Sequence, residues 1–188
     1  MDNIEYIGIQ LCDYLKTIKE IKDCKIYGSI KENNVDKYSD IDLEIDVSGH
    51  DNSIFVSKLP EIIGRKYPVI WYDYAPSLMP EEYIISLAIS EDNPFLIVDI
   101  KCVAYPHMNT FTKENDLINN KFTHIIKVFV ANYKHNIRED DCRNDILRMY
   151  KRIFTEEKDT EDMLESVYNW LLENSEEKYI KYLQNIKK

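Results

Sequence analysis

Residues 38–47 read YSDIDLEIDV, and from Asp40 onward they alternate strictly between acidic and aliphatic side chains. A period of two is typical of a β-strand that buries one face. The aliphatic positions run from Ile41 to Val47, and the acidic positions run from Asp40 to Asp46. The stretch therefore predicts a half-buried strand with a row of carboxylates on its other face.

A glycine and a serine close the preceding strand candidate, residues 24–27. Gly28 would let the backbone approach a phosphate closely, and the Ser29 hydroxyl and nearby N–H groups would donate to phosphate oxygens. Asp40 and Asp42, two residues apart on one strand, would place their side-chain origins roughly 6–7 Å apart on the same face. Hard oxygen ligands at that separation suit Mg²⁺.

A third carboxylate, Asp99, interrupts the apolar stretch 95–103. An unpaired charge is costly to bury there, so Asp99 is the best candidate for a third metal ligand. Three carboxylates would hold two Mg²⁺ ions about 3.5–4 Å apart. The alternatives are structural: Asp40 and Asp42 belong to a solvated acidic row, and Asp99 pairs with Lys101.

The pattern GS-x10-DxD, followed by an aspartate on a later strand, resembles the DNA-polymerase-beta-like nucleotidyltransferase superfamily. The resemblance implies a mixed β-sheet flanked by helices. It also implies that Gly28 and Ser29 bind the nucleotide phosphate, and that Asp40, Asp42 and Asp99 bind Mg²⁺. Residues 107–188 match the superfamily only in being helical.

Hydrophobic periodicity predicts the remaining elements. Strands are expected at 69–72 and 95–103, and residues 81–90 are compatible with a helix or a strand. Helices are expected at residues 3–22, 53–66, 114–133, 141–154, 159–173 and 176–187. The fold class is therefore α+β: a catalytic domain at residues 1–106 and a C-terminal helical bundle at residues 107–188.

The chain carries 34 acidic and 24 basic residues, a net charge of −10. That balance disfavours a long nucleic acid as the partner and favours a cationic small molecule. Four cysteines without CxxC spacing predict free thiols, and the histidines lack metal-ligand spacing. With no apolar run of membrane-spanning length and no signal sequence, we expect a cytoplasmic protein without a membrane partner.

The predicted reaction moves a nucleoside monophosphate (NMP) from an NTP, expected to be ATP, to a hydroxyl group, with release of pyrophosphate. In plan the chain is similar to the aminoglycoside and lincosamide antibiotic nucleotidyltransferases. It is also similar to antitoxins that adenylylate a partner toxin, and a nucleotide- or partner-binding module without turnover is a third hypothesis.

Further residues are candidates for contact with the substrates. Lys31 and Lys101 are candidates for phosphate contact, and the aromatic cluster 71–74 for stacking or for strand packing. The similarity to the antibiotic nucleotidyltransferases implies an additional carboxylate as general base. Six acidic residues are open candidates, Glu114, Asp116, Glu139, Asp140, Asp141 and Asp145, and Asp99 itself is a further candidate.

Overall fold

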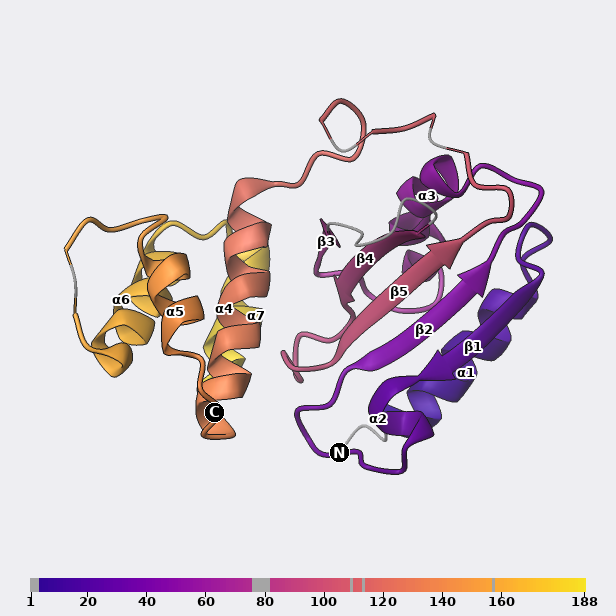
Figure 1. The fold of residues 1–188 in the computed structure, drawn as a ribbon. Coiled ribbons are helices and arrows are strands. Elements are labelled where there is room, and N and C mark those ends of the chain that lie inside the picture. Colours follow the sequence, from indigo (N-terminus) through magenta and orange to yellow (C-terminus); the bar gives the residue numbers. More distant parts are fainter. Residues whose placement is uncertain (1–3, 76–81, 109, 113, 157) are drawn as a thin grey trace. The chain divides into compact units, whose positions relative to one another are not determined.

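The computed structural model describes residues 4–75, 82–108, 110–112, 114–156 and 158–188 (Figure 1). It divides into two compact units. The α/β unit comprises residues 1–90 and 95–119, and the helical unit comprises residues 91–94 and 120–188. The proposed division after residue 106 stays a prediction, since residues 107–119 belong to the α/β unit by their contacts.

The α/β unit contains a five-stranded mixed sheet in the order β1-β2-β5-β4-β3 (Figure 1). The central pair β2–β5 is parallel, and the other three pairs are antiparallel. The strands are β1 (Asp23–Tyr27), β2 (Ile41–Asp46), β3 (Trp71–Ala75), β4 (Glu82–Ala88) and β5 (Ile97–Val103).

Two helices cover one face of this sheet. Helix α1 (Ile4–Lys16) packs on β1 and β2, and α3 (Asn52–Gly64) packs on β4 and β5 (Figure 1). Their apolar stripes meet the aliphatic side chains of the central strands, including Leu43 and Ile100, which are fully buried. The carboxylates of β2 lie on the opposite face, because successive residues of a strand alternate sides.

The helical unit contains α4 (Lys121–Ile137), α5 (Arg143–Tyr150), α6 (Thr160–Glu173) and α7 (Glu177–Asn185). Its core is rich in aromatic side chains; for example, Phe129 stacks on Tyr168 with ring centroids 5.9 Å apart. The predicted α+β class, with a mixed sheet flanked by helices and C-terminal helices after it, is confirmed. No helix in the described residues is long and apolar enough to cross a membrane.

Several predicted boundaries differ from the structure for local reasons. The first helix ends at Lys16 rather than residue 22, because the following turns use hydrogen bonds between residues three apart, such as Thr17 N to Tyr14 O. Residues 30–37, whose polar sequence predicts a loop, begin inside the one-turn helix α2 (Gly28–Lys31). The ambiguous segment 81–90 contains β4.

Ser53 was predicted as the cap of helix α3, but the helix begins at Asn52 and its N-cap is Asp51. Asp51 Oδ1 accepts hydrogen bonds from the backbone N–H groups of Ser53 and Ile54. Burial alone would raise the pKa of Asp51, but hydrogen bonds from Ser53 and Thr110 and from these amides lower it. The helix continues through Pro60, although a proline removes one helical hydrogen bond.

Asp51→Ala is expected to lower the free energy of unfolding by about 1 kcal/mol at neutral pH, since it removes the cap. Asp51→Asn keeps a capping oxygen without the charge and serves as the matched control. Because folding lowers the pKa of Asp51, its charge stabilises the fold above the unfolded pKa, near 4, and this contribution is lost as the pH falls further. Urea unfolding at pH 7 and pH 3 measures the free energy of unfolding of wild type and of Asp51→Asn. If the difference between their unfolding free energies is the same at both pH values, the contribution of the charge is contradicted.

The segment Glu91–Pro94 packs within the helical unit. Tyr182 of α7, fully buried, donates its hydroxyl to the Pro94 carbonyl at 2.6 Å. Tyr182→Phe is expected to lower the free energy of unfolding by about 1–2 kcal/mol, because the buried Pro94 carbonyl loses its hydrogen-bond donor. Tyr105→Phe, at a hydroxyl-bearing side chain that is 63% exposed, should stay within about 0.5 kcal/mol of wild type. Equal unfolding free energies for the two variants would disprove the role of this bond.

Candidate active site

Gly28 lies directly against the carboxylate of Asp42. Its φ of +63° is in the left-handed region that favours glycine. A Cβ at this position would collide with Asp42 Oδ2 and would lie 2.9 Å from Asp42 Cγ. Tyr27, which precedes Gly28, is the register partner of Asp42 across the β1–β2 pair. The glycine is therefore required for the strand end to pass this close to the acid.

Asp42 and Asp99 face each other across the central parallel pair, as register partners of β2 and β5. Adjacent strands are about 4.8 Å apart, so the two side chains start close together on the same face. Both acids act on Tyr27: burial first, and then the charges of Asp42 and Asp99, raise the pKa of Tyr27 to about 12. The structure thus brings together two of the three predicted metal ligands.

Asp40 lies just before β2 rather than within it. The strand starts late because Asp36 closes a turn, accepting hydrogen bonds from Tyr38 N and Ser39 Oγ. Within the described residues, no group of three or more histidine, cysteine, aspartate or glutamate side chains is arranged to hold a metal ion. The role of Asp40 as a ligand stays a prediction.

Ser29 Oγ is buried and has no hydrogen-bond partner among the described residues. A buried hydroxyl without a partner is costly, which makes it a natural donor to a bound group.

The four cysteines are free and buried, as expected. Burial raises the pKa of the Cys24 and Cys102 thiols, so they stay protonated.

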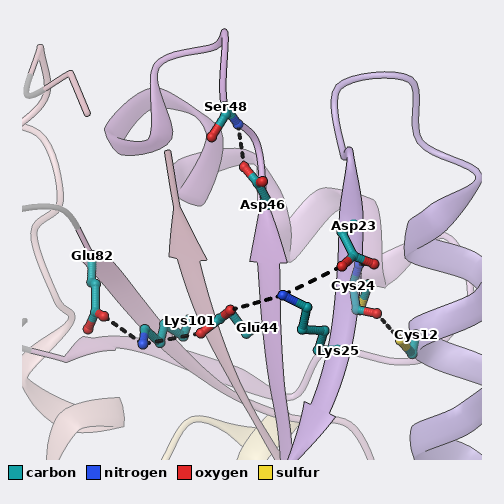
Figure 2. Close-up of polar contacts among 9 residues, drawn as sticks. All are labelled: Cys12, Asp23, Cys24, Lys25, Glu44, Asp46, Ser48, Glu82 and Lys101. Atoms are coloured by element: carbon teal, nitrogen blue, oxygen red, sulfur yellow. Dashed lines mark hydrogen bonds and ion pairs between the residues drawn. The ribbon is translucent and has the colours of Figure 1, made fainter. Parts of the chain in front are cut away.

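Figure 2 shows a charge network around Lys101 and Glu44. By the strand registers, these two residues lie on the same face as Asp42 and Asp99, two residues further along their strands. Lys101 contacts Glu82 at 2.6 Å and Glu44 at 3.2 Å, and Lys25 reaches Glu44 at 4.0 Å. The hydrogen bond to Glu82 contributes most to raising the pKa of Lys101. Lys101 therefore pairs with the glutamates rather than with Asp99, which weakens the structural alternative for Asp99. Lys31 is exposed at the end of α2.

The aromatic cluster 71–74 divides between the two faces of the sheet. Tyr72 and Tyr74 contact each other edge-on, with centroids 5.6 Å apart, and lie on the helix-covered face, where Tyr74 joins the core. Asp73 is buried on the face of the aspartate pair, in register with Ser86. The two tyrosines thus fit the strand-packing interpretation better than stacking on a substrate at Asp42 and Asp99.

No family model matches this chain, and neither does any curated protein. Among solved structures, it is similar to a chain in the structure of the GLD-2/RNP-8 complex. The two chains are 10% identical, and the superposition covers 90% of this chain and 78% of that one, with a TM-score of 0.42. The functional assignment therefore rests on the residues of the site.

The six candidates for a general base are divided between the units. Glu114 and Asp116 are exposed in the α/β unit, and the other four belong to the helical unit. Asp140 pairs with His135 at 2.8 Å, and Asp145 pairs with Arg148. The identity of an additional general base stays an open prediction.

A groove of about 330 Å³ lies between α4 and α5 of the helical unit. Of its nine lining residues, four are basic and one, Asp145, is acidic. The basic residues are Lys127, His135, Arg148 and Arg152. This groove does not suit a polycationic ligand, and the cationic partner expected from the net charge of −10 stays a prediction.

Two site residues were missed by the sequence interpretation. Tyr27 directly precedes Gly28 at the end of its strand, and this position is the signal that could have placed it beside Asp42. Ser86 donates a hydrogen bond to Asp99 Oδ1, but it lies in the segment whose secondary structure was ambiguous. Only the order of the strands reveals that it neighbours Asp99.

Proposed function

We propose that this protein is a metal-dependent nucleotidyltransferase, which moves an NMP from an NTP to a hydroxyl group. The observation that carries the proposal is the Asp42–Asp99 pair, in register on adjacent strands, with the backbone of Gly28 packed against the Asp42 carboxylate. A purely solvated acidic strand face does not require a glycine at this point of contact.

The donor set fits Mg²⁺, which proteins commonly bind through one or two carboxylates together with substrate phosphates and water. Asp42 and Asp99 would hold the metal, with Asp40 as a further ligand, and two ions are expected. When bound, Mg²⁺ supplies neutralisation of the triphosphate charge.

The chain's own residues then bind and orient the reactants. The Ser29 hydroxyl and the backbone at Gly28 donate to phosphate oxygens, which holds the α-phosphorus in place. The acceptor oxygen bonds to that phosphorus while the bond to the bridging oxygen of the β-phosphate breaks, and pyrophosphate leaves. The acceptor proton passes to a carboxylate, for which Asp99 is the candidate within the pair.

The expected acceptor is a cationic, hydroxyl-bearing small molecule of the aminoglycoside or lincosamide kind, with ATP as the expected donor. Acidic side chains dominate the face that carries the site, where Glu44 and Asp46 continue the row of Asp42. A cationic acceptor would be attracted to this face and would offset its charge.

To test the proposal, the protein is incubated with Mg²⁺, each of the four α-labelled NTPs and a panel of aminoglycosides and lincosamides. Labelled product and pyrophosphate are expected with at least one pair. The same labelled NTPs added to a cell lysate test a protein acceptor, because one labelled band would favour the antitoxin-like activity. Absence of label and pyrophosphate in both settings would refute nucleotidyl transfer.

A further inference from the structure

A row of polar side chains crosses the whole sheet at the level of the aspartate pair. The strand registers place Tyr27, Asp42, Asp99, Ser86 and Asp73 opposite one another in that order. Residues directly opposite on adjacent strands point to the same face. Ser86 is therefore the neighbour of Asp99 on the side away from Asp42.

Ser86 is unusual for its position. Its neighbours in β4, from Ile85 to Ala88, are buried and otherwise apolar, and Ser86 itself is only 3% exposed. Serine has no strand preference of its own, and burying a hydroxyl is costly unless it is hydrogen-bonded. The partner is Asp99: Ser86 Oγ donates to Asp99 Oδ1.

The hydrogen bond from Ser86 uses one carboxylate oxygen of Asp99, and the other oxygen is available for a ligand. Within the described residues, Asp99 Oδ1 accepts from Ser86, and Asp99 Oδ2 takes part in no hydrogen bond. A carboxylate that is anchored through one oxygen presents the second in a restricted set of orientations. Such anchoring is how hydrogen bonds behind a metal ligand orient it and tune its affinity.

We propose that Ser86 is a positioning residue, which holds the Asp99 carboxylate so that Oδ2 serves as a metal ligand beside Asp42. The inference rests on the proposed function. A merely structural serine would satisfy a buried polar group, and its loss would change stability without changing metal affinity.

The test compares the wild-type chain with Ser86→Ala and Ser86→Thr, using Mn²⁺ alone as the probe in titrations followed by electron paramagnetic resonance. Ser86→Ala is expected to raise the Mn²⁺ Kd about 10–100-fold, the usual effect of losing such a hydrogen bond. Ser86→Thr retains a hydroxyl and favours a strand, so it should recover most of the affinity. In the transfer assay, the Mg²⁺ concentration for half-maximal rate should rise by a similar factor, with kcat at saturating Mg²⁺ changing less.

Ser53→Ala is the matched control. Ser53 is also buried, and its hydroxyl also donates to an aspartate, Asp51, but at the start of α3 on the other side of the sheet. The Ser53→Ala variant should have a lower Tm than wild type and an unchanged Mn²⁺ Kd. If Ser86→Ala behaves like Ser53→Ala, the positioning role is wrong while the proposed function stands. If wild type itself binds no Mn²⁺, the metal-dependent function fails and this inference fails with it.

Discussion

Asp42→Asn is expected to reduce NMP transfer by ~10³-fold, which corresponds to a loss of ~4 kcal/mol of transition-state stabilisation. The substitution keeps the size of the side chain and removes the charge that would bind Mg²⁺. Asp42 also lies opposite Asp99, and like charges directly opposite on neighbouring strands destabilise a sheet. Loss of the charge at residue 42 relieves this repulsion, and thermal unfolding of the variant separates lost activity from a folding defect.

Glu44→Gln is the control for this prediction. Glu44 lies on the same strand and the same face, two residues beyond Asp42, but it pairs with Lys101. Transfer by this variant should stay within about 3-fold of wild type, whereas the loss of a partly exposed ion pair costs at most about 1 kcal/mol of stability. Steady-state transfer kinetics, Mn²⁺ titration and thermal unfolding of both variants give the comparison.

The same pair of variants separates three interpretations of the acidic strand. A solvated face predicts equal and small effects of both substitutions on activity. A nucleotide-binding module without turnover predicts that Asp42→Asn leaves nucleotide affinity unchanged. Only a metal-dependent transferase predicts a large loss for Asp42→Asn with a small one for Glu44→Gln.

Local patterns predicted half of the site because local interactions build that half. The alternation in residues 41–46 reports directly which side chains share a face, and Gly28-Ser29 marks the end of the neighbouring strand. Asp40 was predicted within the same strand. The strand instead begins one residue later, at Ile41, after the turn that Asp36 closes. That turn depends on side-chain hydrogen bonds, which hydrophobic periodicity does not report.

The other half of the site depends on which strands are neighbours. Asp99 was found because a charge stands out in an apolar strand. Ser86 and Asp73 carried no such signal, since the place of Ser86 beside Asp99, and of Asp73 beside Ser86, follows from the order β2-β5-β4-β3. Strand order comes from contacts between residues far apart in the chain, which hydrophobic periodicity does not encode.

Gly28→Ala is expected to reduce the transfer rate at least ~10²-fold and to destabilise the fold. Alanine at a φ of +63° costs about 1–2 kcal/mol from backbone conformation alone. In addition, the new Cβ would collide with Asp42 Oδ2, so the carboxylate or the strand end must move. Since shifts of about 1 Å at a catalytic group cost ~10²-fold, we expect at least that loss in transfer rate.

Gly49→Ala separates the two causes. Gly49 also has a positive φ, +96°, but the nearest atom to its added Cβ would be Lys22 Nζ at 3.9 Å. This variant should show the conformational penalty in urea unfolding with unchanged transfer. A similar loss of transfer in both variants would show that general destabilisation, and not the contact with Asp42, inactivates Gly28→Ala.

A double-mutant cycle with Asp42→Ala tests the contact itself, because it removes Oδ2 and Cγ, the two atoms nearest the new Cβ, and leaves only the Cβ of residue 42 at 3.3 Å. In that background, the stability cost of Gly28→Ala should fall towards the cost measured for Gly49→Ala, and the difference between backgrounds gives the coupling between residue 28 and the carboxylate. A cost that is the same with and without the Asp42 side chain would mean that the strand end does not pack against this acid. The measurement needs neither the acceptor nor the metal, so it tests the geometry of the site independently of the reaction assigned to it.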